Sequence, residues 1–492
     1  MSRATAPTVI ERAAQADALI ARYADLIADP SQLRETLLQP LPVVLWANPL
    51  RLDRQSLRML LLEDGFAAEP LPWHPLALRL PPGSRPGRHW TFLAGLNRIQ
   101  EEVSMVPVSL LDPQPGERIL DLCAAPGSKT AQIAVAMDDT GTLVANDSKR
   151  GRVAGLRQMI KRLGLVNCSV TVRDGQGMDS RAGTFDRILV DAPCSCEGTF
   201  RKITRPEMVT DEVRRRAALV QRRLLRRAVA LTRPGGRIVY STCTFAPEEN
   251  EAVVDAILRE HGDNLHLRPA ALPGLVASPG IRHWLGRGFH PEMHHCARIW
   301  PHQQDTGGFF VAVLEKAAGP RSEDGACFNH AEETRDWLRP LTDRFAIPVS
   351  AFDGVRLIRR GNRHVHALTP DHQAPSAPAP EMLGLPLIRR KSLPLKPTSS
   401  AVLRWGMQAQ QNWLELDADQ RDSFLRRQTV VVRTGQLARC TGPGYAVARH
   451  RDHVLGLGQL VYDRESPTVR LLSLVPKAWA RDAGESAENL AD

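Results

Sequence analysis

The sequence lacks a long apolar run and a disulfide framework. None of its 492 residues lies in a segment approaching the roughly 18 consecutive apolar residues of a membrane span, and no apolar signal core follows the first five residues. Its eight cysteines are scattered, without the spacing of a small disulfide-rich domain, which is typical of a reducing compartment. We therefore expect a cytoplasmic protein that does not enter a membrane.

Acidic residues are outnumbered by basic ones. The chain has 64 Lys and Arg against 54 Asp and Glu, a net charge of +10 and a pI near 9.5. Such an excess favours a polyanionic partner such as nucleic acid, although it also occurs for solubility alone. The basic residues are densest around a helix predicted at Asp211–Thr232, whose apolar stripe begins at Val213. The opposite face of this helix is basic, which favours RNA or DNA binding over simple solvation.

The segment from Glu117 to Thr130 resembles a phosphate loop but lacks its defining pattern. That pattern places Lys directly after Gly, whereas Ser128 separates Gly127 from Lys129 here, and the expected upstream glycine is missing. The segment instead predicts a buried strand, a Pro-Gly turn and a helix start, whose free N–H groups suit a ligand. Asp147 follows the next strand, where a Rossmann-like site has its ribose partner. We therefore predict a nucleoside site.

Strands and helices alternate between residues 96 and 317, which predicts a parallel, doubly wound α/β sheet. The flanks predict an α/β module at 1–95, a connecting mixed segment at 318–370, a Pro-rich linker, a β-rich binding module at 381–478 and a flexible tail at 479–492. Arginines of the first module could contact phosphate or be solvated. The expected core strands are Arg118–Leu122, Thr142–Asn146, Ser169–Val172, Asp186–Val190, Arg237–Tyr240 and Phe309–Leu314.

Carboxylates and cysteines follow successive predicted strands. Asp147, Asp174 and Asp191 come at three strand ends, and Cys194 and Cys243 follow two of them. Because parallel strands end at one edge of a sheet, we expect these side chains to converge there. A single cysteine is more often a small buried side chain, but two of them beside a nucleoside site predict covalent catalysis with a second thiol assisting.

Three segments closely resemble the motifs of the Sun-type RNA cytosine-5 methyltransferases. They are Asp121 to Thr130, Asp191-Ala192-Pro193-Cys194-Ser195, and Tyr240 to Thr244 followed by Glu248 to Glu251. The likeness covers about 95 to 317, and the flanks resemble the RsmF branch, with a C-terminal PUA-like RNA-binding module. It implies a Rossmann-like methyltransferase core, S-adenosyl-L-methionine as cofactor and a monomer that acts on RNA. Ribosomal RNA or the small ribosomal subunit is the expected partner, with transfer RNA as the alternative.

The resemblance also implies roles for individual residues. Cys243 is the nucleophile that adds to C6 of cytosine, and Cys194 assists loss of H5 and release of product. Asp191 lies near the methyl centre and can contact the pyrimidine near N3 or N4. Asp147 binds the ribose hydroxyls, Asp174 lies near the adenine, and Arg152 completes the cofactor site. The loop around the methionine part of the cofactor consists of Cys123, Ala124, Ala125, Pro126, Gly127, Ser128 and Lys129.

One position departs from the family pattern. Cys196 stands where the family usually has glycine, which adds a third thiol. Either Cys194 or Cys196 could then be the second functional cysteine, and the Pro-Cys step favours Cys194.

Two other functions use the same fold. A non-catalytic RNA-binding or ribosome-assembly factor would not need the cysteines, and a DNA cytosine methyltransferase would use Cys194 as its nucleophile. No metal is expected, because a histidine-rich group matches no standard zinc spacing. That group is His290, His294, His295, Cys296 and His302.

Overall fold

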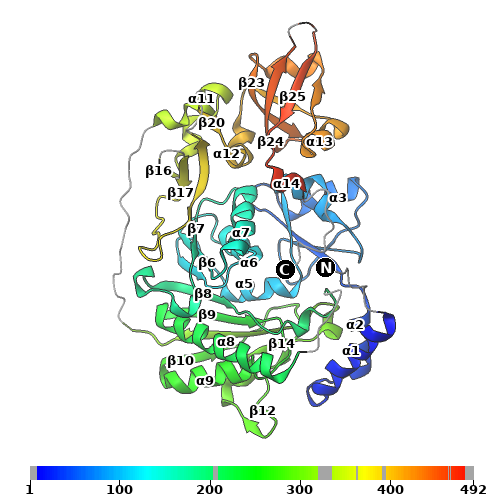
Figure 1. Ribbon diagram of the computed structural model, residues 1–492, viewed down its shortest axis with the longest axis vertical. Helices are drawn as coiled ribbons and strands as arrows, with labels where there is room; N and C mark the ends of the chain where they lie inside the picture. Colours follow the sequence, from blue (N-terminus) through cyan, green and yellow to red (C-terminus); the bar gives the residue numbers. More distant parts are fainter. Residues whose placement is uncertain are drawn as a thin grey trace.

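The computed structural model describes residues 8–202, 209–319, 335–361, 364–389, 395–463, 465 and 467–481. Most of the expected tail, 482–492, lies outside these ranges, as does 320–334 with Cys327. A central α/β core carries an N-terminal unit along one side and a C-terminal β-rich unit at one end (Figure 1). Among the helices of the described ranges, none combines the length and apolarity needed to span a bilayer.

The core is a mixed sheet in the order β11-β14-β15-β9-β8-β5-β6-β7-β18, with β10 also paired to β15. Strands β9, β8, β5, β6 and β7 are parallel. The strand bounds are β5 Arg118–Asp121, β6 Thr142–Asp147, β7 Cys168–Val172, β8 Phe185–Asp191, β9 Thr232–Thr242, β10 Leu265–Arg268, β11 Ser278–Pro279, β14 Ala297–Ile299, β15 Phe309–Lys316 and β18 Met382–Leu383.

The direction predicted for Phe309–Leu314 is wrong. This strand, β15, is antiparallel to β9, and β14 is antiparallel to β15. An apolar run identifies a buried strand without fixing its direction. Only residues 300–308 separate β14 from β15, too few for the crossover that a parallel pair requires.

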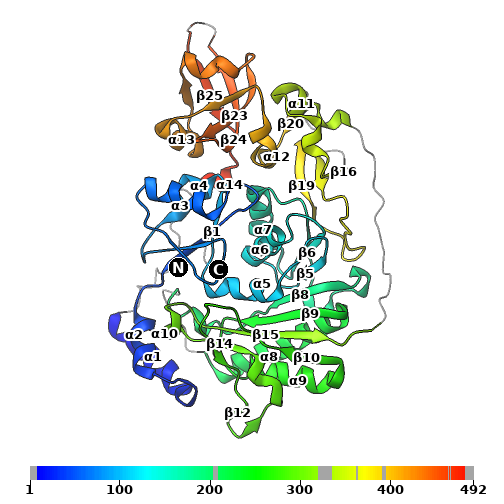
Figure 2. The same cartoon turned by 180° about the vertical axis from the view of Figure 1, so that it is seen from behind.

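Helices cover both faces of the sheet and give it two separate apolar cores. Side chains of α6 and α7 pack in one core, and those of α8 and α9 pack in the other. Helix α8 begins where Thr210 accepts a hydrogen bond from the Val213 amide, and two acidic residues follow in its first turn. Figure 2 shows the same layers from behind. The bounds are α6 Ser128–Ala136, α7 Arg150–Leu163, α8 Asp211–Leu231 and α9 Glu251–His261.

The N-terminal unit consists of a small sheet and a helix pair that packs on the core. Helix α2 lies beside α10 (Figure 2), and the ring of Tyr23, after α1, packs against the rings of Phe245 and Trp284. Helix α1 begins in a capping box formed by Thr8 and Glu11. The sheet order is β2-β3-β1-β4. The bounds are α1 Val9–Arg22, α2 Pro30–Leu38, α3 Arg54–Glu63, α4 Trp90–Leu93, α10 Pro301–Gln304, β1 Val43–Ala47, β2 Glu69–Pro70, β3 Ala77–Leu80 and β4 Asn97–Ile99.

Several arginines of this unit point into the protein. Arg51 donates to the carbonyls of Ala94 and Val454, and burial lowers its pKa to about 10. Arg54 and Arg58 likewise donate to backbone carbonyls, and Arg79 pairs with Glu102. These contacts use guanidinium groups that could otherwise have contacted phosphate.

A four-stranded sheet in the C-terminal half combines strands from both sides of the division expected between 370 and 381. In this sheet, of order β16-β17-β19-β20, strand β17 pairs with β19, which lies beyond that division in the sequence. The proline-rich stretch between them lies against the core, where His372 Nε2 is 2.6 Å from Ser169 Oγ and Gln373 donates to Thr142 Oγ1. It leads into β18, which extends the central sheet beside β7. The bounds are β16 Arg356–Arg360, β17 His364–Leu368, β19 Leu385–Arg389 and β20 Lys396–Pro397.

A second sheet, in the order β21-β23-β24-β25-β22, forms the β-rich unit at the top of Figure 1. It shares one apolar core with the N-terminal unit, and the rings of Trp90 and His450 pack edge to face at 5.1 Å. The small N-terminal sheet and the β-rich unit therefore adjoin at one end of the molecule. The bounds are β21 Trp413–Glu415, β22 Val430–Val432, β23 Gly444–His450, β24 His453–Tyr462 and β25 Val469–Ser473, with helices α12 Ser399–Trp405 and α13 Ala418–Leu425.

Candidate active site

The turn between β5 and α6 is shaped by Gly127. This residue has φ 113°, in the left-handed region, and a Cβ placed there would lie 2.4 Å from Met159 Cε and 2.6 Å from Leu156 Cδ1. Glycine therefore permits the close approach of the turn to α7. Helix α6 begins at Ser128 without a side-chain cap, so its first N–H groups face the carboxyl edge of the sheet.

Asp147 joins this turn to the end of β6. Its buried carboxylate accepts hydrogen bonds from the amides of Ala125, at 3.2 Å, and Lys149, at 2.9 Å. Arg152 lies 3.5 Å from the same carboxylate and donates to the Ala125 carbonyl at 2.5 Å. The structure therefore brings together three of the residues expected around the cofactor.

Asp121 was not among the expected site residues, although it ends β5 as Asp147 ends β6. Its Oδ2 accepts a hydrogen bond from Thr130 at 2.6 Å, whereas its buried Oδ1 has no hydrogen-bond partner among the described residues. Burial raises its pKa to about 7, against the opposing effect of the Thr130 hydrogen bond. An unpaired carboxylate oxygen beside the turn fits the α-amino group of a methionine-containing ligand. Its place at a strand end was the signal in the sequence.

Asp174 is more exposed than Asp121 and Asp147. It follows β7 and accepts a hydrogen bond from the Gln176 amide at 3.0 Å, which caps the short turn at Gly175–Gly177. The residue lies at the expected sheet edge, and its partner in the structure is local.

Lys129 connects the turn to the end of β8. Its Nζ lies 2.7 Å from Asp191 Oδ2 and 3.0 Å from Ser104 Oγ. Ser241 donates to Asp191 Oδ1 at 2.8 Å. Asp191 is therefore fixed from two sides, and Ser104 and Ser241 are positioning residues that the sequence did not predict.

Three thiols meet beyond the ends of β8 and β9. The Sγ atoms of Cys194 and Cys243 are 3.3 Å apart, those of Cys194 and Cys196 are 4.0 Å apart, and all three lie within 4.8 Å of one another. All three are free cysteines. Cys196 has φ 60°, in the left-handed region that glycine adopts most readily. This conformation explains why glycine would suit the position.

The thiols influence one another's ionisation. Hydrogen bonds from Cys194 and Cys243, helped by the charges of Lys202 and Arg152, lower the pKa of Cys196 to about 3. Hydrogen bonds with Cys196 and Cys243, together with burial, raise the pKa of Cys194. A hydrogen bond from Cys194 lowers the pKa of Cys243, but the neighbouring Cys196 and burial outweigh it and raise that pKa. These effects favour ionisation of the exposed Cys196 over that of its two neighbours.

Cys123, although it follows β5 directly, behaves differently. Burial raises its pKa well above the ordinary value, and Cys123 is not one of the three thiols that meet beyond β8 and β9. Its surroundings agree with a small side chain that allows close packing.

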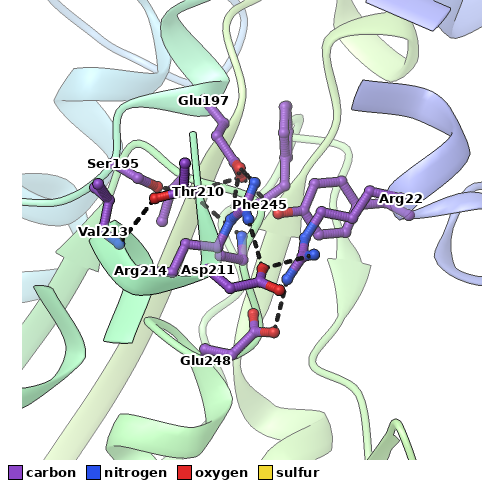
Figure 3. A network of polar contacts seen from close by, with 12 residues as sticks. Arg22, Ser195, Glu197, Thr210, Asp211, Val213, Arg214, Phe245 and Glu248 are labelled. Carbon is purple, nitrogen blue, oxygen red and sulfur yellow. Dashed lines mark hydrogen bonds and ion pairs between the residues drawn. The ribbon is translucent and has the colours of Figure 1, made fainter. Parts of the chain in front are cut away.

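Glu197 ties the two cysteine-bearing loops to distant parts of the chain (Figure 3). Its side chain is 2% exposed and accepts hydrogen bonds from Tyr23 at 2.6 Å, Thr244 at 3.0 Å and Arg214 at 2.6 Å. Thr244 Oγ1 in turn lies 2.7 Å from Ser195 Oγ, which links the loop after β9 to the loop after β8. The positions of Cys194 and Cys243 therefore depend on this network.

The same network extends to α1 and α8. Arg22 forms ion pairs with Asp211 at 3.0 Å and Glu248 at 2.9 Å, and Arg214 also pairs with Asp211 (Figure 3). Arg214 is buried while Val213 is 48% exposed, so the predicted start of the apolar stripe of α8 was wrong. The ion pair with Glu197 draws the arginine inward. Part of the basic face of α8 thus serves the protein's own structure.

Comparisons with known proteins agree with this geometry. Residues 108–315 match the family model described as 16S rRNA methyltransferase RsmB/F. A tRNA (cytosine(49)-C(5))-methyltransferase of Pyrococcus abyssi is 37% identical over 61% of this chain and 95% of the relative. Ribosomal RNA small subunit methyltransferase F of Shewanella amazonensis is 35% identical over 57% of this chain and 59% of the relative.

A solved structure agrees as well. The methyltransferase homologue from Pyrococcus horikoshii is 30% identical, with a TM-score of 0.55 over 63% of this chain and all of that one. Two longer relatives are matched over only 41% and 39% of their length. The near-complete coverage of the shorter relatives, together with the family match, shows that the chain belongs to the RsmB/F methyltransferase family.

Proposed function

We propose that this protein transfers a methyl group from S-adenosyl-L-methionine to C5 of a cytidine in RNA through a covalent Cys243–C6 adduct. The observation that carries the proposal is the 3.3 Å separation of the Cys194 and Cys243 sulfurs at the ends of adjacent strands. Asp191, held by Lys129, lies at the end of the strand that leads to Cys194.

The cofactor pocket proposed here consists of the turn 123–129 with Asp147 and Arg152. Asp147 retains lone pairs that can accept the ribose hydroxyls, and Asp121 Oδ1 can accept from the α-amino group. Asp174 completes the adenine end. Bound S-adenosyl-L-methionine supplies an electrophilic methyl group on a sulfonium. Lys129 contacts the ring of Phe309 at 5.4 Å as well as Asp191, which keeps its charge on the boundary between the two ligand sites.

The proposed chemistry follows from the poor nucleophilicity of cytosine C5. The Cys243 thiolate adds to C6, which breaks the C5–C6 double bond and gives C5 enamine-like character. C5 then takes the methyl group. Cys194, next to the Cys243 sulfur, accepts H5 as a proton. The C5–H electron pair restores the C5–C6 double bond as the C6–S bond breaks and the Cys243 thiolate leaves. Asp191 holds the pyrimidine through its N3 or N4 edge.

The substrate we propose is small-subunit ribosomal RNA. The matched relative from Shewanella amazonensis is named for this substrate, and the one from Pyrococcus abyssi for tRNA, which is the alternative. Chemistry on one base edge requires an unstacked or single-stranded nucleotide. The C-terminal β-rich unit, as a PUA-like module, and the N-terminal unit would hold the RNA backbone.

Trapping of the adduct tests the proposal. The parent protein, Cys243→Ala and Cys194→Ala are incubated with methyl-labelled cofactor and RNA or DNA. We expect the parent to methylate RNA, Cys243→Ala to form no adduct, and Cys194→Ala to accumulate a covalent RNA adduct. An adduct that requires Cys194 instead would overturn the assigned roles. Failure of the parent protein to methylate any RNA would favour a non-catalytic binding factor.

A further inference from the structure

We propose that Cys194, Cys196 and Cys243 form a binding site for a thiophilic divalent metal ion, Zn²⁺ in the first place, and that the bound ion reversibly blocks the nucleophilic sulfur. The binding follows from the geometry of the three thiols alone. Its inhibitory consequence rests on the proposed function, in which the Cys243 sulfur must be free to attack.

The distances between the sulfur atoms are close to those between the sulfur ligands of such an ion. Zinc binds thiolates at about 2.3 Å in tetrahedral geometry, which places two ligand sulfurs roughly 3.8 Å apart. The observed separations are 3.3 Å and 4.0 Å, with every pair within 4.8 Å. Small side-chain rotations suffice to surround an ion.

The backbone holds the three thiols in place before a metal arrives. The Gly198 amide donates to the Cys243 carbonyl at 2.9 Å, and the Ser195 amide donates to Glu249 Oε2 at 3.0 Å, so both loops are fixed. The left-handed conformation of Cys196 turns its side chain toward the Cys194 carbonyl, 3.4 Å away. A preorganised set of ligands loses little conformational freedom on binding.

Access and charge also suit a metal. Cys196 is exposed and the other two thiols are half-buried, so an ion can enter from solvent and keep a water as fourth ligand. Three thiolates with one divalent ion carry a net charge of −1, and binding releases a proton from each sulfur still protonated. The positive charges of Lys202 and Arg152 near Cys196 offset the negative charge.

Spectroscopy with Co²⁺ tests the binding independently of methyl transfer. The full chain, reduced with a phosphine and stripped of metal, is titrated with Co²⁺ and the visible bands of tetrahedral thiolate coordination are recorded. We expect one ion per chain, displaced by Zn²⁺. Cys196→Gly, which removes one ligand at a position suited to glycine, should weaken binding by at least about tenfold. Cys440→Ser, which leaves the three thiols intact, is the matched control.

The enzymatic arm then tests inhibition. Zn²⁺ should suppress RNA methylation by the parent protein, and a chelator should restore it. At the same Zn²⁺ concentration, Cys196→Gly should lose a smaller fraction of its own metal-free activity than the parent protein does. Equal Co²⁺ affinity in the parent and Cys196→Gly, or absence of the tetrahedral bands, would overturn the site. Normal Co²⁺ binding in a parent protein that methylates no RNA would instead overturn the proposed function and leave the metal site standing.

Discussion

The cofactor turn and the cysteine loops share one edge of the sheet but are stabilised in different ways. In the turn, the Asp147 carboxylate accepts hydrogen bonds from the backbone amides of Ala125 and Lys149, and Lys149 lies only two residues further along the chain. The cysteine loops depend on Glu197, whose partner Tyr23 lies 174 residues earlier in the chain. A local motif therefore encodes the cofactor turn, whereas the spacing of the thiols is a property of the tertiary structure.

The change with the largest expected effect disrupts the contacts that position the cysteine loops. Glu197→Gln removes the buried counter-charge of Arg214 and leaves only its ion pair with the exposed Asp211, which should lower the free energy of unfolding by about 3 kcal/mol. Methyl transfer should fall steeply while the folded fraction keeps its affinity for cofactor. Chemical denaturation, kcat and calorimetric cofactor binding measure the three quantities. Glu212→Gln, on the exposed face of the same helix, is the control and should leave stability unchanged.

A change in the cofactor turn should mainly weaken cofactor binding, whereas the change at Glu197 should mainly reduce methyl transfer. Gly127→Ala forces a side chain into the left-handed region at a cost of about 1–2 kcal/mol, and its Cβ meets Met159 and Leu156. We expect the cofactor dissociation constant to rise by about tenfold, with a smaller effect on kcat at saturating cofactor. Gly151→Ala, where an added Cβ meets no atom within 4 Å, is the control. A fall in kcat without a change in cofactor affinity would contradict the distinction.

Tyr23→Phe tests the long-range contact with a smaller perturbation. Loss of one hydroxyl that donates to Glu197 should reduce stability by about 1 kcal/mol and lower kcat severalfold, with cofactor affinity unchanged. Thermal denaturation and steady-state kinetics check this. Tyr462→Phe, on the exposed surface, controls for the loss of a phenol hydroxyl. Weaker cofactor binding in Tyr23→Phe would mean that α1 supports the cofactor turn as well as the cysteine loops.

The smallest expected effect is a shift in pH dependence. The Cys196 thiolate helps raise the pKa of Cys243, so Cys196→Gly should lower that pKa. A lower pKa means that the Cys243 thiolate forms at lower pH, and kcat/KM should reach its plateau at lower pH than in the parent protein. A pH profile of kcat/KM measures the shift, and Cys440→Ser should leave it in place. An unchanged or upward-shifted profile would show that Cys196 does not control ionisation of the nucleophile.

The sequence predicted the core elements and the edge at which the site lies. The strand expected at Thr142–Asn146 is observed at Thr142–Asp147, and the helix expected at Asp211–Thr232 at Asp211–Leu231. Apolar periodicity and the rule for strand ends suffice for such predictions because both act over a few residues. They also explain why the sequence could place Asp147, Asp191 and Cys243 at one edge of the sheet.

The rest depends on contacts that leave no local pattern. Arg214 and Glu197 read as ordinary surface charges until folding brings them together with Tyr23. The direction of β15 depends on its connection to β14, and the pairing of β17 with β19 crosses a proline-rich stretch that reads as a linker. Long-range pairing of this kind is decided by the fold as a whole.

The short strand β18 has a consequence for dissecting the protein. It covers the outer side of β7, with Met382 opposite Val170 and Leu383 opposite Ser169. A chain ended after the catalytic core would leave the backbone donors and acceptors of β7 unpaired along an open sheet edge, where a second molecule could add its own strand. The isolated core should therefore self-associate, and soluble fragments should be designed to keep residues up to at least 389, where β19 ends.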